Sequence, residues 1–153
     1  MAGQIFNITS NDTLSLNGNV FNDLADGDDV VINFPNQLMT RKTGKNGNSI
    51  ISQNANGLNA DLVLRVMRGS SDDVFLNNLV PANVPDFPST VLLSGTFIKR
   101  IGDGQGNVRS DVYVLAGGTV SKIPDAKENV EGDTTQGVTI YNIIFASGQR
   151  SIG

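Results

Sequence analysis

Residues 91–116, VLLSGTFIKRIGDGQGNVRSDVYVLA, decide the fold of this chain. Residues 91–100 and 108–116 are extended runs rich in β-branched and aromatic side chains, which is the composition of strands. Residues 103–107 lie between them and hold two glycines, as a long-loop hairpin requires. The stretch therefore predicts two long antiparallel strands joined by a flexible turn.

The rest of the chain predicts more short strands and one helix. Asn17 and Gly18 mark a hairpin turn within residues 13–21. Ser70 or Ser71 can cap a helix of about three turns, with acids in its first turn and Pro81 at its end. Further strands are expected at residues 30–34, 62–67, 119–123 (after a turn at 117–118) and 134–146. The fold class is mainly β: an antiparallel β-sandwich or barrel with one short α-helix, in a single domain over residues 1–153.

The composition excludes most catalytic chemistry. The chain has no His and no Cys, so catalytic triads, thiolate nucleophiles and imidazole metal sites are impossible. The acids at 23, 26, 28 and 29 lack the ligand order of a calcium loop, and Asp72 and Asp73 suit a helix N-terminus better than a glycosidase pair. We expect no enzyme activity and no cofactor.

Charge and hydropathy narrow the possible partners. A net charge of −4 argues against general nucleic-acid binding, and no apolar run is long enough to insert into a membrane. No signal peptide is visible, so synthesis in the cytoplasm is expected. Only 17% of residues are charged. Either Asn, Ser and Thr replace charges at the surface, or much of the surface is buried against other subunits.

The segment from about residue 40 to 58 is the most unusual part of the chain. Arg41, Lys42 and Lys45 follow forty residues that hold five acids and no base. Ile50 and Ile51 then lie in the middle of a polar stretch rich in Gly and Asn. Apolar side chains in such a loop favour insertion into a partner subunit over packing on their own domain.

Three stretches together resemble the tail tube proteins of bacteriophages with contractile tails, and the related type VI secretion tube proteins. They are residues 62–79, the hairpin around 95–114, and residues 122–133 leading into 138–141. The resemblance implies hexameric rings whose sheets are completed by neighbouring subunits, stacked into a hollow tube in the tail of a virion made in a bacterial host. It implies tail sheath, baseplate and tape-measure proteins as partners, and a loop at 40–58 that contacts the next ring.

The resemblance also implies a channel through which genomic DNA passes without specific binding. An acidic wall would repel the phosphates, and Asp103, Asp111 and Asp133 are the candidates to line it. If Val112 and Val114 face the core, Asp111 and Tyr113 point outward. Alternative functions are a tail terminator, a tube component near the baseplate, or a β-sandwich binding module, the last disfavoured because Trp is absent.

Overall fold

The computed structural model describes residues 3, 5–25, 29–126, 128, 130 and 134–153. Along the chain the elements are β1 (Asn7–Leu16), β2 (Asn19–Val20), β3 (Val30–Asn33), β4 (Met39–Thr43), β5 (Ser49–Gln53), β6 (Ala60–Met67), α1 (Ser71–Asn77), the 3-10 turns η1 (Pro81–Asn83) and η2 (Phe87–Ser89), β7 (Leu93–Gly102), β8 (Val108–Val120), the 3-10 turn η3 (Thr134–Gly137) and β9 (Val138–Ile152). The chain is thus mainly β, as predicted.

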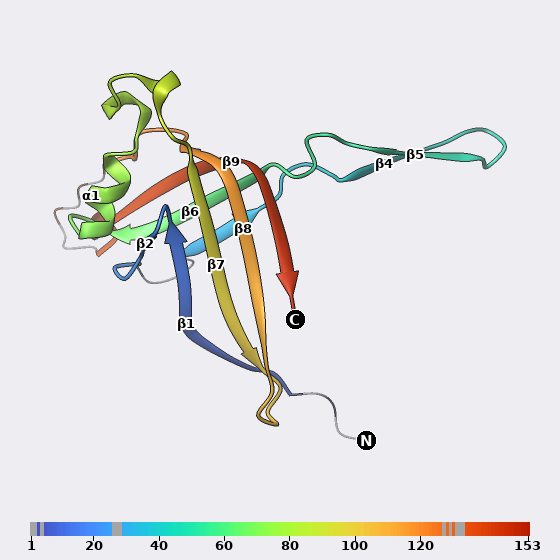
Figure 1. The fold of residues 1–153 in the computed structure, drawn as a ribbon, viewed down its shortest axis with the longest axis horizontal. Coiled ribbons are helices and arrows are strands. Elements are labelled where there is room, and N and C mark those ends of the chain that lie inside the picture. Colours follow the sequence, from blue (N-terminus) through green and yellow to red (C-terminus); the bar gives the residue numbers. More distant parts are fainter. Residues whose placement is uncertain (1–2, 4, 26–28, 127, 129, 131–133) are drawn as a thin grey trace.

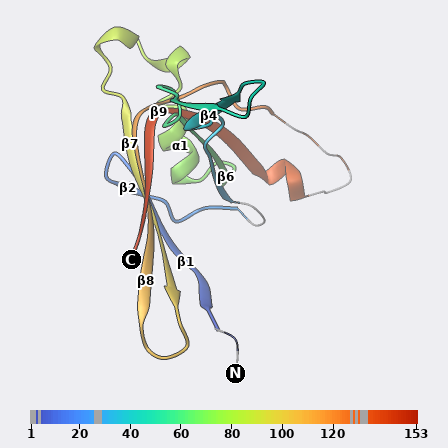
Figure 2. The same ribbon diagram turned by 90° about the vertical axis from the view of Figure 1, so that its right-hand side faces the viewer.

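Seven strands form one antiparallel sheet in the order β2-β1-β7-β8-β9-β6-β3, and β4 and β5 form a separate two-stranded sheet. The long strand β9 joins its two parts: residues 138–145 pair with β6, and residues 143–152 pair with β8. We call β1, β7, β8 and the end of β9 the four-stranded ply, and the remainder, with α1, the body. Figure 2 shows α1, β6 and the start of β9 on one side of the ply.

The core lies between the ply and the body. Alternate residues of β6, from Ala60 to Val66, are fully buried, as expected for a strand with one face on a core. Leu16 from β1, Leu115 from β8 and Ile143 from β9 pack against them. α1 closes the end of this core with Leu76. The ply extends beyond the core at the end where β7 and β8 are joined (Figure 1).

Strand β8 passes through the glycine pair at which a turn was predicted. Leu93 pairs with Gly118 and Gly95 with Leu115, so β8 has one extra residue opposite β7 and forms a β-bulge. Gly117 adopts φ +70°, which a glycine accepts without strain. The bulge lets the ladder with β9 continue, and the predicted turn is therefore wrong.

Other element boundaries also differ from the sequence prediction. α1 ends at Asn77, one turn earlier than expected, because the next residues form the turn that leads into Pro81. The last strand begins at Val138, four residues later than predicted, and continues to Ile152. The predicted loop at 40–58 is mostly a hairpin of β4 and β5, because opposite backbone groups satisfy each other in a ladder.

Candidate assembly site

The hairpin of β4 and β5 projects from the molecule as an arm, which we define as residues 39–53 (Figure 1). Every residue of its two strands is exposed. Its turn is closed by hydrogen bonds from the Gly44 amide to the Asn48 carbonyl (2.8 Å) and from the Gly47 amide to the Gly44 carbonyl (3.1 Å). The arm is therefore a regular structure without a core of its own, and two-stranded hairpins of this kind are marginally stable when isolated.

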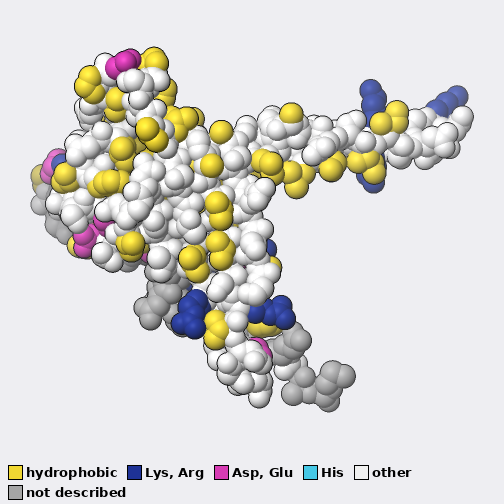
Figure 3. Space-filling view, in the orientation of Figure 1, with side chains coloured by type: hydrophobic (Ala, Val, Ile, Leu, Met, Phe, Trp, Pro, Cys, Tyr) yellow, Lys and Arg dark blue, Asp and Glu magenta, His cyan; other side chains and the backbone are white. Residues whose placement is uncertain are grey.

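The five predicted contact residues all lie on or near this arm. Arg41 pairs with Ile51 and Lys42 pairs with Ile50, while Lys45 lies in the turn. Ile50 and Ile51 are 71% and 69% exposed. Because they are neighbours in a strand, they point to opposite faces. Each face thus combines an apolar side chain with a cation, and Figure 3 shows both kinds along the arm.

Hydrogen bonds and close packing join the two sides of the base of the arm. The Asn54 amide donates to the Leu38 carbonyl at 2.9 Å, and the Asn54 side chain donates to the Gln37 carbonyl at 2.8 Å. Gly57 packs so tightly here that a Cβ would lie 2.8 Å from the Leu38 Cα. These contacts hold the two sides of the base of the arm together.

The four-stranded ply has two open edges. Strand β2 pairs with β1 only at Ser15 and Leu16, and the Phe21 amide donates to the Leu14 carbonyl. Within the described chain, no strand covers β1 from residue 7 to 13. At the other edge, β6 ends its pairing with β9 at Phe145, and the Gly148 amide still donates to the Leu58 carbonyl. Beyond Gly148 no described strand covers β9. Such edges can accept another strand.

Asp111 lies on the opposite face from the one predicted. Leu115 is 1% exposed and Val114 is 51% exposed, so Asp111 and Tyr113 share the body-facing side of β8 with Leu115. The Asp111 carboxylate accepts two hydrogen bonds from Arg150, at 2.8 and 3.0 Å. This pairing raises the pKa of the Arg150 guanidinium. The prediction failed because β8 carries apolar side chains on both faces.

Asp103, the second acidic candidate, lies in the turn between β7 and β8. The Asp103 carboxylate accepts from the Gln105 amide (2.7 Å) and from the Asn107 side chain (2.8 Å), so it closes the turn between β7 and β8. The hydrogen bond from the Asn107 side chain is the main cause that lowers the pKa of Asp103. Asp133 lies outside the described residues.

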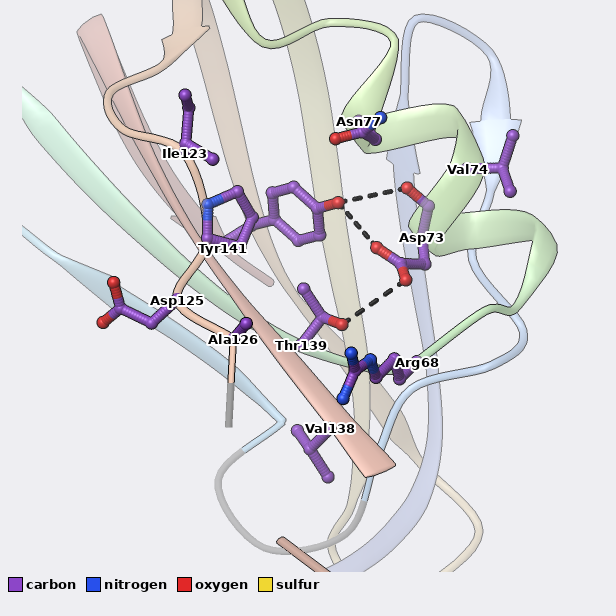
Figure 4. Close-up of a pocket in the computed structure, with 11 residues that line it drawn as sticks. Arg68, Asp73, Val74, Asn77, Ile123, Asp125, Ala126, Val138, Thr139 and Tyr141 are labelled. Atoms are coloured by element: carbon purple, nitrogen blue, oxygen red, sulfur yellow. Dashed lines mark hydrogen bonds between the residues drawn. The ribbon is translucent and has the colours of Figure 1, made fainter. Parts of the chain in front are cut away.

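A second cluster, which sequence reasoning missed, fixes α1 to the sheet (Figure 4). The Tyr141 hydroxyl donates to Asp73 Oδ1 at 2.6 Å, and the Gly69 amide donates to Asp73 Oδ2 at 2.9 Å. Burial, followed by the hydrogen bond to Asp73, raises the pKa of the Tyr141 hydroxyl far above its usual value. This cluster thus has a structural role: the Asp73 carboxylate connects the start of α1 to β9.

The neighbouring acid, Asp72, connects α1 to the segment that follows β2. It is 4% exposed, and its Oδ2 accepts from the backbone amides of Asn22 (2.9 Å) and Asp23 (2.8 Å). The predicted helix-start role of the two acids is confirmed, since both lie in the first turn of α1. No sequence pattern indicated these side-chain contacts, because the partners are far away in the chain. The two partners of Asp72 are 49 and 50 residues away, and Tyr141, the partner of Asp73, is 68 residues away.

The described residues form neither a metal site nor a membrane-spanning helix. No group of three or more acidic side chains there is arranged to hold a metal ion. In the same part of the chain, no helix has the length and apolar character needed to cross a membrane.

Comparisons with known proteins show a shared fold. No protein-family model and no curated protein matches the chain. Among solved structures, it is similar to the sheath/tube terminator of the PVC extracellular contractile injection system in its extended state, with 9% identity, 94% of each chain covered and a TM-score of 0.52. It is also similar to the tube-terminating cap of the anti-feeding prophage, AFP, with 9% identity, 100% of this chain and 94% of that chain covered, and a TM-score of 0.55.

A third similar structure is a chain of the PVC sheath–tube complex in the extended state. The identity is 9%, the match covers 96% of this chain and 91% of the other, and the TM-score is 0.55. At this identity the likeness concerns the fold alone. The chain thus shares its fold with components of contractile injection systems, as the resemblance implied in general terms, and the three structures named here are a terminator, a cap and a sheath–tube component rather than phage tail tube proteins.

Proposed function

We propose that this chain is a structural subunit that ends the tube of a contractile-tail-type particle, as a ring-forming terminator. Two of the similar structures named above are described as a terminator or a terminating cap, and these matches cover nearly the whole of both chains. The proposed partners are further copies of the chain, the tube and the sheath, with baseplate and tape-measure proteins in the same particle. The proposed role is non-enzymatic and needs no cofactor.

The observation that carries this proposal is the pair of open edges on the four-stranded ply. β1 and the end of β9 lie at opposite edges of the ply, so one copy can pair its β1 with the β9 of the next. Each such junction adds backbone hydrogen bonds and removes an exposed edge that would otherwise promote aggregation. Repetition around an axis closes a ring, and six copies are the number that the resemblance implies.

A tube subunit is the second candidate, favoured by the similarity to the PVC sheath–tube complex and by the arm. A subunit of either kind forms a ring through its edges. The difference lies in stacking: a tube subunit polymerises along the axis through the arm, while a terminator uses the arm to contact a different protein. The two candidates therefore predict different products from the purified chain.

The test is the assembly state of the purified full chain, measured by light scattering after size-exclusion chromatography and by negative-stain electron microscopy. Single rings that do not stack support the terminator, and long hollow rods support the tube subunit. A monomer that persists at high concentration contradicts both.

The junction itself can be tested because the chain contains no native cysteine. Thr13→Cys together with Ser151→Cys places one thiol near each open edge, so a short bis-maleimide should link copies into a ladder that stops at the closed ring. Ser89→Cys replaces Ser151→Cys in the matched control, since Ser89 lies in η2, away from both edges. Equal ladders from both pairs would contradict pairing between β1 and β9.

A further inference from the structure

The two faces of the four-stranded ply carry different chemistry. Register places Leu14, Phe97, Tyr113 and Arg150 in one row across the body-facing side. The opposite side, which we call the bare face, points away from α1, β6 and the start of β9 (Figure 2). Its described side chains include Asn7, Thr13, Ser15, Thr96, Ile98, Arg100, Val108, Ser110, Val112, Val114, Ala116, Ser147, Gln149 and Ser151.

Among these described residues of the bare face, Arg100 carries the single charge. The chain provides hydroxyl, amide and aliphatic groups at the other positions. Arg100 is exposed, and no described acid forms an ion pair with it. Its neighbour in the ladder, Ser110, is uncharged. On the body-facing side, in contrast, Asp111 is neutralised by Arg150 at 2.8 Å.

Ring closure decides which face lines the channel. If the plies of several copies join edge to edge, as the proposed function requires, one face of the joined sheet points to the axis. In every copy α1, β6 and the start of β9 occupy the other face (Figure 2). Several copies of these elements cannot fit inside a channel that the plies themselves enclose. The bare face must therefore point inward, and the arm and α1 must lie outside.

We propose that the bare face is the channel wall and that a ring of Arg100 side chains gives this channel a weak, salt-sensitive affinity for a polyanionic chain such as DNA. This inference rests on the proposed ring. It differs from the acidic wall expected from the sequence: Asp111 is on the other face, the Asp103 carboxylate is hydrogen-bonded within a turn, and Asp133 lies outside the described residues. A near-neutral wall offers few fixed phosphate contacts, so a polyanion can still slide.

The experiment uses assembled rings of the full chain and a fluorescently labelled DNA duplex, with retention measured between 50 and 200 mM salt. Wild-type rings should retain the duplex at low salt and release it as salt rises, with each phosphate contact contributing about 0.9 to the slope of log affinity against log salt. Arg100→Gln rings should lose most of this retention. Arg109→Gln is the matched control, since Arg109 is also exposed but pairs with Ile101 on the body-facing side.

Electron microscopy of the same samples distinguishes a failure to form rings from a failure of the rings to bind DNA. Absence of rings in the wild type contradicts the proposed function, and with it the channel. Rings that bind no DNA at 50 mM salt, or that respond equally to Arg100→Gln and Arg109→Gln, overturn the Arg100 inference while leaving the ring intact. Thermal denaturation should be the same for both variants, which shows that a loss of binding does not come from unfolding.

Discussion

Replacing Ile50 and Ile51 by serine should separate assembly from folding. Both side chains are about 70% exposed in the single chain. Full burial of an isoleucine side chain stabilises by about 1.5–3 kcal/mol, so covering the remaining surface in a partner contributes about 1–2 kcal/mol for each residue. The double variant should therefore lose about 2–4 kcal/mol for each arm contact, because serine has little apolar surface to bury.

This loss is measurable as a shift in the concentration at which higher-order species form. A cost of about 2–4 kcal/mol corresponds to a shift of about 30- to 700-fold in the dissociation constant of the contact. Light scattering over a dilution series measures the shift, with the tube partner added if the chain alone forms single rings. Folding stability should change by less than about 0.5 kcal/mol, because exposed surface substitutions have small effects.

The single variants add information on the shape of the partner. Since the two isoleucines point to opposite faces of the arm, a flat partner surface buries one and a groove buries both. Equal losses from Ile50→Ser and Ile51→Ser would indicate a groove. Ser52→Ala, on the same exposed strand, is the control and should leave assembly unchanged. An unchanged concentration dependence in the double variant would refute the role of the arm.

Three further predictions concern the body and are measured by chemical and thermal denaturation. Tyr141→Phe should cost about 1.5–3 kcal/mol, because it removes a hydrogen bond to the Asp73 carboxylate. Since burial raises the pKa of Tyr141 when folded, wild-type stability should fall as pH rises above about 10, where the unfolded tyrosine ionises, and the variant should lose that part of the pH dependence. Asp72→Ala should cost about 1–3 kcal/mol for each of the two amides it leaves without a partner, and a change below 1 kcal/mol would contradict the contact. Gly118→Ala should cost about 1–3 kcal/mol, because the new Cβ would lie 2.3 Å from the Phe145 ring, and wild-type stability would show that the ring can move.

The strands and the start of the helix could be predicted from local pattern. The alternation in β6 and the long runs of β7 and β8 are strand signals in any context, and Ser70 followed by two acids marks a helix start. The arm residues were also identified, because Ile50 and Ile51 are out of place in a polar loop. Whether they bind a partner remains a prediction.

The faces of the ply could not be predicted, because residues 112–115 of β8 are apolar or aromatic on both sides. Packing decided between them: the Phe34 ring lies 6.3 Å from Tyr113, and Leu115 joins the core, which turns Asp111 toward Arg150. The bulge at Gly117 depends in the same way on pairing with β7 and β9.

The amino-acid sequence by itself determined the class of this protein: a β fold with one short helix, without the side chains for imidazole or thiol chemistry, and with an unusual basic segment. Only the tertiary structure decided which strand edges stay open, which face of the ply is bare, and where the arm points. The physical reason is that strand formation follows from local side-chain pattern, whereas edges and faces exist only after residues far apart in the chain have paired.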